Sequence, residues 1–174
     1  LDPAAAILHG RQLVEAGADL LDVGGESTRP GSPGVDAARE QQRVLPVIEA
    51  LARTVDVPIS IDTTKPEVAR AALDAGATVI NDVRGLRAGD ELARLAADRS
   101  ASLILMHSRG TPADMQQQTH YDDLLGEVGA ALGEAAETAM RAGVPRERLV
   151  LDPGIGFAKE AVDNLRLLNR LGRL

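Results

Sequence analysis

Short apolar runs alternate with longer segments of helical periodicity along the whole chain. Runs rich in Val, Ile and Leu and bounded by turn-forming residues are typical of buried strands, whereas apolar residues repeated every three or four positions are typical of helices. The predicted strands are residues 19–23, 57–62, 77–83, 102–107 and 148–152. The predicted helices begin near Asp2, Asp36, Thr64, Glu91 and Asp122, and a sixth runs from behind the last strand to the end of the chain.

Capping and breaking residues define several of these boundaries. Asp2 followed by Pro3 is typical of a helix start, because the aspartate caps the first turn and proline is preorganised for the first helical position. Thr64 and Glu67 stand at the spacing of a capping box, which predicts that the third helix begins at Thr64. Pro46 lies inside the second predicted helix and is expected to bend or divide it.

One joint between a helix and a strand occurs twice. The segments LVEAGADLLDV (13–23) and ALDAGATVINDV (72–83) share a helix, an Ala-Gly-Ala turn and a strand. In each, the glycine is expected to end the helix, because it adopts the left-handed backbone conformation that closes a helix C-terminus. The chain therefore repeats one α-to-β joint.

Five strands, each followed by a helix, predict an α/β fold with a parallel sheet, because consecutive parallel strands need crossover connections. The order of elements fits both an open doubly wound sheet and a (β/α)8 TIM barrel. A complete barrel takes about 250 residues, so about five strands and six helices correspond to a partial barrel. We expect one domain over residues 1–174, since a chain of this length forms one core of moderate size.

Composition narrows the class of protein. Lys plus Arg number 19 against 26 Asp plus Glu, and the net charge of -7 is scattered in both signs along the chain. This distribution argues against nucleic acid or an anionic membrane as a partner, because both need a concentrated basic face. The chain has no cysteine, which excludes a disulfide scaffold and fits a reducing compartment. No apolar run approaches the ~20 residues of a membrane-spanning helix, so we expect a cytoplasmic protein.

The residues behind each predicted strand are polar and rich in turn formers. They read DVGGESTRPG, IDTTK, NDVRG, MHSRGTP and LDPGIGFAK. In parallel α/β folds the ligand site lies at the carboxyl ends of the strands, so Asp62, Asn81 and Asp152 are candidates for one cluster. Two carboxylates and an amide suit either a flat heterocycle with an N–H-rich edge, such as a pterin, or a metal ion. The three histidines are dispersed, at positions 9, 107 and 120, which favours the heterocycle.

Each of these polar residues also has a purely structural interpretation. An Asp or Asn at a strand end is often a helix cap or the first residue of an Asx-turn. We expect Asp22 and Asp82 to be structural, His107 to be a hydrogen-bonded strand-end histidine, and Lys65 and Arg109 to be solvated loop charges.

Together these loops resemble the dihydropteroate synthases, the folate-pathway enzymes that are the target of sulfonamides. DVGGESTRPG matches the signature of that family, and the likeness recurs in chain order at PISIDT, VINDV, LMHSRGTPADMQ and LDPGIGFAK. The resemblance covers essentially all 174 residues. It implies a (β/α)8 barrel that joins 6-hydroxymethyl-7,8-dihydropterin pyrophosphate to p-aminobenzoate, with Mg²⁺, and a possible homodimer of the complete protein.

The resemblance also assigns roles to residues. The positions that bind the pterin are Asp62, Asn81, Met106 and Asp152, and those that contact or close on p-aminobenzoate are Thr28, Arg29, Pro30 and Phe157. Loss of pyrophosphate leaves a cation at the pterin methylene, which fixed carboxylates around the ring stabilise. Asp62 is therefore expected to take part in the chemistry, and Arg29 to shield the cation from water.

The resemblance covers only part of the family's barrel. Numbered by the family, the chain starts in the first helix and ends in or just after the sixth. We therefore expect the first strand, whose loop handles magnesium pyrophosphate, and the last two strands to lie outside these residues. The protein ligand of the metal is then outside them as well. An open five-stranded piece exposes two parallel edges, so we expect the isolated chain to be unstable or self-associating, and inactive.

Three positions depart from the family pattern. Ala158 stands where a glycine is common, Glu160 where a threonine or asparagine is common, and Asp163 where a histidine is common. The two acidic residues add negative charge near the expected mouth of the site. They leave open a pterin-binding paralogue without catalysis. A second alternative is a relative of the methyltransferases that carry a methyl group from methyltetrahydrofolate to a corrinoid protein.

Overall fold

Five parallel strands alternate with six helices in the computed structural model, which describes residues 2–27, 34–111 and 114–174. The strands are β1 (Leu21–Gly24), β2 (Ile59–Asp62), β3 (Val79–Asp82), β4 (Ser102–Met106) and β5 (Leu149–Asp152). The helices are α1 (Pro3–Glu15), α2 (Ala37–Ala52), α3 (Pro66–Asp74), α4 (Glu91–Asp98), α5 (Leu124–Arg141) and α6 (Ala161–Asn169). Three short 3-10 turns lie at Met115–Gln117, Arg146–Arg148 and Leu171–Arg173.

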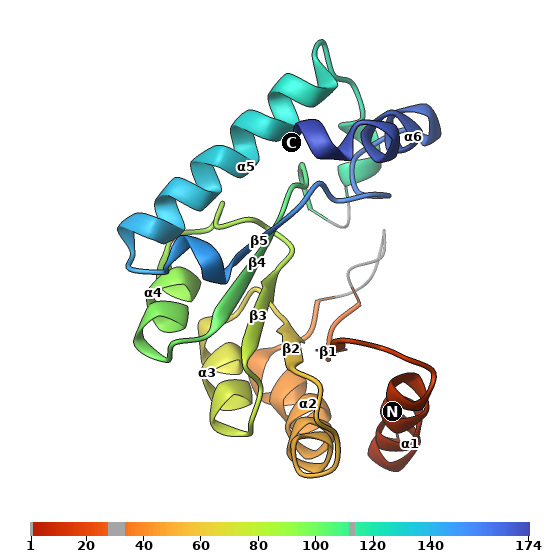
Figure 1. The fold of residues 1–174 in the computed structure, drawn as a ribbon, viewed down its shortest axis with the longest axis vertical. Helices are drawn as coiled ribbons and strands as arrows, with labels where there is room; N and C mark the ends of the chain where they lie inside the picture. Colours follow the sequence, from red (N-terminus) through yellow and green to blue (C-terminus); the bar gives the residue numbers. More distant parts are fainter. Residues whose placement is uncertain (1, 28–33, 112–113) are drawn as a thin grey trace.

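The sheet has the strand order β1-β2-β3-β4-β5, and every neighbouring pair is parallel. Figure 1 shows α2, α3, α4 and α5 along one side of the sheet, with α1 at one end of the molecule and α6 at the other. A doubly wound sheet carries helices on both faces and reverses its strand order. Neither occurs in the described residues, so the fold is a partial (β/α)8 barrel, with β1 and β5 as its two edges.

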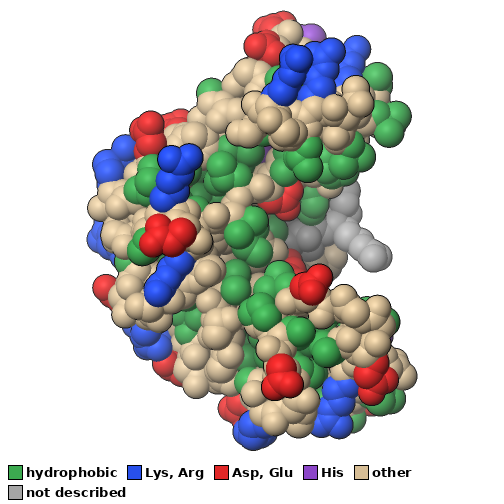
Figure 2. All heavy atoms as spheres, in the orientation of Figure 1, with side chains coloured by type: hydrophobic (Ala, Val, Ile, Leu, Met, Phe, Trp, Pro, Cys, Tyr) green, Lys and Arg blue, Asp and Glu red, His purple; other side chains and the backbone are tan. Residues whose placement is uncertain are grey.

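The strands bury one face and leave the other free of helices. Ile59, Ile61, Ile80, Leu103 and Leu105 are at most 2% exposed and belong to the main hydrophobic core, together with apolar side chains of α2, α3 and α4. Successive residues of a strand point to opposite faces, so the intervening residues line the concave face. Figure 2 shows the molecule hollowed on this side, between its two ends.

The repeated helix-to-strand joint is confirmed. Gly17 has a φ of 99° and Gly76 a φ of 113°. The residue after each glycine donates a hydrogen bond to the carbonyl five residues earlier. These bonds run from Ala18 N to the Leu13 carbonyl at 2.9 Å and from Ala77 N to the Ala72 carbonyl at 3.0 Å. Both joints are Schellman caps, in which a left-handed residue lets the chain fold back onto the last helical turn.

Pro46, which was expected to bend or divide the second helix, does not divide α2, which is continuous from Ala37 to Ala52. The carbonyl that proline leaves unpaired belongs to the exposed residue Gln42 and can meet water. Two other local predictions are wrong in detail. The third helix begins at Pro66 and not at Thr64, because proline at the first helical position has no N–H that needs a cap. The last helix stops at Asn169 and is followed by a separate 3-10 turn.

Among the described residues, no helix combines the length and the apolar character needed to cross a membrane.

Two glycines test these backbone assignments. A methyl group at Gly76 would lie 2.6 Å from the Ala52 Cβ in a left-handed conformation, whereas one at Gly133, in the middle of α5, would meet no atom within 4 Å. We predict that Gly76→Ala lowers the free energy of unfolding by about 2 kcal/mol and that Gly133→Ala raises it by about 1 kcal/mol. Urea unfolding followed by circular dichroism measures both, and a neutral Gly76→Ala would contradict the cap geometry.

Candidate functional site

Two of the four predicted pterin-binding side chains, Asp62 and Asn81, are neighbours across the sheet. The strand register pairs Gly24 with Asp62, Asp62 with Asn81, and Asn81 with Ile104. This row continues to Val150, and Asp152 lies two residues further along β5, where it pairs with Met106. Because alternation keeps residues of one row on one face, Asp62 and Asn81 share the helix-free face near the carboxyl ends of their strands.

Asp22 was expected to be structural, and it holds other side chains of this face in place. Its carboxylate accepts a hydrogen bond from the Ser60 hydroxyl and another from Asn81 Nδ2, at 3.2 Å. Asp22 thus fixes the amide of Asn81 from the strand two places away. Asp82 is structural as predicted, since it is buried and accepts from the backbone N–H groups of Arg84 at 2.9 Å and Leu86 at 2.7 Å.

Asp62 lies in an acidic, poorly hydrated environment. Burial, and then the charges of Asp22, Glu40, Asp82 and Glu26, raise its pKa to about 7. No group in the described part of the chain donates a hydrogen bond to its carboxylate to offset this. A ligand that supplies N–H donors or positive charge would relieve the repulsion and lower the pKa of Asp62. Asp62 is therefore a candidate ligand-binding group.

Asp152 is both a candidate ligand and a turn residue. Its Oδ1 accepts the backbone N–H of Gly154 at 2.7 Å, which is the Asx-turn that sequence reasoning left open. One carboxylate oxygen therefore holds the loop behind β5, and the other has no partner in the described residues. The same side chain can shape the loop and accept from a ligand.

A pocket of about 560 Å³, open to solvent, lies beside this face. Its acidic wall consists of Glu26, Glu40 and Asp62, its basic wall of Arg84 and Arg87, and Met115 and Phe157 supply apolar surface. Of the predicted residues, Asp62 and Phe157 line the pocket, whereas Asn81, Met106 and Asp152 lie outside its lining.

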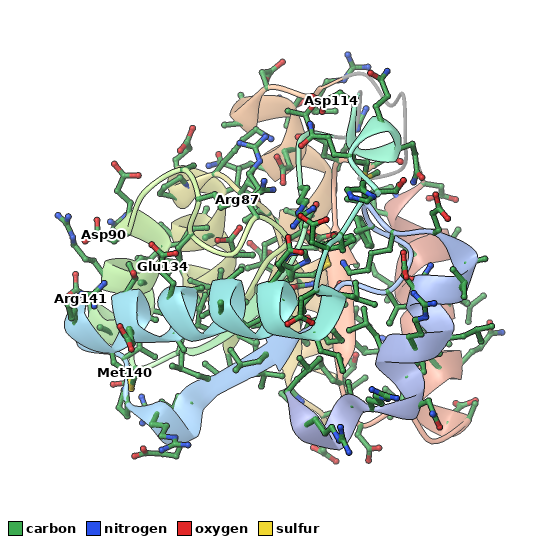
Figure 3. All side chains as sticks on the ribbon, turned by 90° about the horizontal axis from the view of Figure 1, so that it is seen from above. Arg87, Asp90, Asp114, Glu134, Met140 and Arg141 are labelled. Atoms are coloured by element: carbon green, nitrogen blue, oxygen red, sulfur yellow. The ribbon has the colours of Figure 1, made fainter. Side chains whose placement is uncertain are left out.

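The basic wall comes from the loop behind β3, which is joined to the loop behind β4. Arg87 Nη2 donates to the carbonyl of Gly110 at 3.3 Å, which ties the two loops together. Asp114 accepts from the backbone N–H of Thr111 at 2.5 Å and closes the second loop on itself. Figure 3 labels Arg87 and Asp114, which lie on the same side of the molecule. These contacts give Asp114 the structural role that the sequence alone does not reveal.

Lys65 is not the solvated charge that the sequence suggests. Its ammonium donates to Glu26 and, at 2.6 Å, to Oε2 of Glu40, whose side chain is fully buried. Burial lowers the pKa of Lys65, but the hydrogen bonds and charges of the two glutamates outweigh it and raise the pKa. The other oxygen of Glu40 has no hydrogen-bond partner in the part of the chain that the structure describes. Lys65 is therefore the cation that makes the acidic wall of the pocket possible.

Arg109 is likewise held in place. Its guanidinium lies 3.8 Å from the centre of the Tyr121 ring, pairs with Glu127 and donates to the His120 carbonyl at 2.7 Å. His107 is a hydrogen-bonded strand-end histidine, as predicted: it is buried, and its Nδ1 lies 3.0 Å from Lys159 Nζ. Neither Arg109 nor His107 lines the pocket beside Asp62.

Two predictions find no test within this geometry. Thr28, Arg29 and Pro30 lie outside the described residues. Within those that are described, no group of three or more Asp, Glu, His or Cys side chains could hold a metal ion. The face that carries Asp62 therefore does not fit a resident metal, and the expected Mg²⁺ has no ligand set here.

Comparison with known proteins identifies the family. Residues 1–174 match the model of the family described as "Pterin binding enzyme". The dihydropteroate synthase of Synechocystis sp. is 46% identical over 169 residues, which are 97% of this chain and 58% of that protein.

Solved structures agree with this match. The Xanthomonas albilineans dihydropteroate synthase with 4-aminobenzoic acid has a TM-score of 0.91 at 48% identity, over 99% of this chain and 60% of that one. The same species' enzyme in complex with 7,8-dihydropteroate has a TM-score of 0.86 at 44% identity, over 98% of this chain and 61% of that one. This chain thus spans about 60% of the length of the relatives it matches.

The raised pKa of Asp62 predicts a pH-dependent stability. The folded state binds a proton at Asp62 up to a pKa of about 7, and an unfolded aspartate has a pKa of 3.8, so ionisation destabilises the fold as the pH rises between these values. We predict that Asp62→Asn stabilises the protein on the order of 2 kcal/mol more at pH 8 than at pH 5. Urea unfolding at both pH values tests this, with the exposed Asp56→Asn as control; an equal effect at both would refute it.

The Lys65 cluster predicts a second stability effect. Lys65→Met leaves the buried Glu40 without its cation, and we expect it to lower the free energy of unfolding by about 3 kcal/mol. The double variant Lys65→Met with Glu40→Leu removes the buried charge as well, so it should be more stable than Lys65→Met alone. A loss below 1 kcal/mol for the single variant, or no recovery in the double, would show that the cluster is solvated.

Proposed function

Because this chain belongs to the family of pterin binding enzymes, we propose that it forms the pterin-binding part of a dihydropteroate synthase. The reaction joins 6-hydroxymethyl-7,8-dihydropterin pyrophosphate to p-aminobenzoate and yields 7,8-dihydropteroate and pyrophosphate. The observation that carries the proposal is the pairing of Asp62 with Asn81 on the helix-free face, beside a pocket that Phe157 lines. Relatives of known structure that bind 4-aminobenzoic acid and 7,8-dihydropteroate support it.

The polar groups of this face suit the pterin ring. A pterin presents ring N–H and amino groups as donors and a carbonyl as acceptor. Asp62 and Asp152 accept hydrogen bonds, and Asn81 can both donate and accept. Asn81 is already oriented by its bond to Asp22, so its carbonyl oxygen and its second N–H point in a defined direction. A prearranged set of donors and acceptors reduces the entropy lost on binding.

The chemistry follows from the charge on this face. The bond between the pterin methylene carbon and the pyrophosphate oxygen breaks, and its electron pair leaves with pyrophosphate. The resulting cation is conjugated with the ring. It lies beside Asp62 and the other carboxylates, whose charges raise the pKa of Asp62. Fixed negative charge in a poorly hydrated site stabilises that cation better than water does. The amine nitrogen of p-aminobenzoate then forms the new C–N bond and releases its proton.

Several parts of the complete site stay predictions. Thr28, Arg29 and Pro30 are proposed to close on p-aminobenzoate, and Met106 to line the pterin site beside Asp152. Mg²⁺ is proposed to accompany the pyrophosphate, held by residues outside those described. Cytoplasmic localisation and a homodimer of the complete protein are proposed on the same family grounds.

The positions that depart from the family pattern do not oppose the proposal. Asp163 is paired with Arg166 at 3.1 Å, and neither Glu160 nor Asp163 lines the pocket. Ala158 has a φ of 49°, in the region that favours glycine, and the Tyr121 hydroxyl donates to its carbonyl at 2.9 Å. The added acidic charge thus lies outside the lining of the pocket beside Asp62.

The experiment is an assay of the full-length protein for pyrophosphate release and dihydropteroate formation with both substrates. We expect turnover that requires p-aminobenzoate, and a fall in kcat/KM of about 100-fold or more in Asp62→Ala, because the developing cation loses its nearest carboxylate. Asp56→Ala, which removes an exposed carboxylate before β2, is the matched control and should keep wild-type activity.

Two other results would overturn the proposal. Pterin binding without product, whatever the concentration of p-aminobenzoate, would identify a non-catalytic pterin-binding protein. Methyl transfer from methyltetrahydrofolate to a corrinoid protein would identify the methyltransferase relative.

A further inference from the structure

Lys159 is a buried cation whose hydrogen-bond partners are all neutral. Its side chain lies behind the pocket wall, and the residue is only 4% exposed. The ammonium donates to the Phe157 carbonyl at 2.9 Å and to the Gly154 carbonyl at 3.0 Å, and it lies 3.0 Å from Nδ1 of His107. It makes no ion pair with any described carboxylate. Burial lowers its pKa to about 8, against the opposing charge of Asp152 and with a smaller contribution from Arg109.

Three acceptors within 3.0 Å match the three N–H bonds of the ammonium, and the His107 carbonyl lies further away, at 3.5 Å. A lysine head group has three donors and no acceptor, so this arrangement leaves none free for a ligand. The acceptors converge on one point, which suits the compact ammonium and not the planar fork of an arginine. Lys159 is therefore built to hold protein groups together.

The groups that Lys159 holds come from two elements. His107 follows β4, whereas Gly154 and Phe157 lie in the loop behind β5. The loop is pressed against the strand end, since a methyl group at Gly154 would lie 1.9 Å from the His107 carbonyl oxygen. The Phe157 N–H also donates to the Gly154 carbonyl at 3.1 Å. One ammonium thus closes a small turn and attaches it to the neighbouring strand.

His107 can accept from Lys159 because its ring is neutral. Burial, followed by the charges of Lys159, Arg109 and Arg87, lowers the pKa of His107 to about 4. Near neutral pH the ring is therefore neutral, and because the ammonium can only donate, the contact selects the tautomer whose Nδ1 carries the lone pair. The contact between the two side chains is a hydrogen bond and not a repulsion between cations.

Phe157 is what this turn presents to the pocket. The chain contains one Phe, one Tyr and no Trp, and Tyr121 is not among the residues that line the pocket. Phe157 is therefore the one benzene-type surface in the wall of that pocket. Its backbone carbonyl is bound by Lys159 and its N–H by Gly154, so the direction of the side chain is set by this turn.

We propose that Lys159 is a positioning residue, which fixes Phe157 against the aromatic ring of the amine substrate without contacting either substrate. The inference rests on the proposed function for the identity of that substrate. Lys159 then acts only through Phe157. Its loss should affect the binding of the amine substrate and not of the pterin, because the turn behind β5 positions Phe157, whereas Asp62 and Asn81 lie on other strands.

The test is a double-mutant cycle on the full-length enzyme. Lys159→Met should raise KM for p-aminobenzoate about tenfold and leave KM for the pterin pyrophosphate and kcat within about threefold. Lys159→Arg, which keeps the charge but not the tetrahedral donor set, should behave like Lys159→Met. In a Phe157→Ala background Lys159→Met should add nothing further, because both changes remove one interaction. Arg170→Met, which removes an exposed cation directly after α6, is the control.

Three results would overturn the proposal. They are an unchanged KM for p-aminobenzoate in Lys159→Met, additive effects in the double variant, or an equal rise in both KM values together with lower thermal stability. If the wild type shows no turnover, the proposed function fails and hydrogen exchange decides about Lys159. Faster exchange of the amides of residues 154–158 in Lys159→Met, with the rest of the chain unchanged, supports the positioning role, and unaltered exchange refutes it.

Discussion

The structure depends on a parallel sheet whose helices cover only one of its faces. Parallel strands joined by helices place all five carboxyl ends on one side. Because α2 to α5 pack on the same face, the other face is not covered by these helices and can hold polar side chains next to apolar ones such as Ile104. Alternation along each strand then sorts the residues: Ile61 and Ile80 enter the core, and Asp62 and Asn81 face the open side. Fold and site are thus two outcomes of one pattern.

The sequence predicts those features that depend on neighbours along the chain. The five strands, the six helices and the repeated Schellman joint all follow from local periodicity and from two glycines. Asp62, Asn81 and Asp152 could be found because each ends an apolar run. The register between strands places Asp62 beside Asn81 and Asp152 beside Met106. It depends on residues far apart in the sequence, so local patterns do not predict it.

What the sequence does not reveal depends on partners from distant segments. Asp22 looks like a turn residue until the register brings Asn81 within reach of its carboxylate. Lys65 looks solvated because its partners come from the loop behind β1 and from α2. An acidic residue inside an amphipathic helix normally faces water, and Glu40 does not. Glu40 lies four residues before Val44, on the buried face of α2. A carboxylate at such a position indicates a cation elsewhere in the chain, because a buried charge needs a partner.

The chain has two lysines among its 19 basic residues. One binds carboxylates and the other binds neutral acceptors. Lys65 binds carboxylates, so it neutralises part of an acidic wall that would otherwise be too costly to bury. Lys159 lies near Asp152 but binds two carbonyls and a neutral imidazole instead. If Lys159 paired with Asp152, the ion pair would neutralise the negative charge of that carboxylate. By using neutral acceptors, the loop is held in place while the negative charge of Asp152 stays available to a cationic ring.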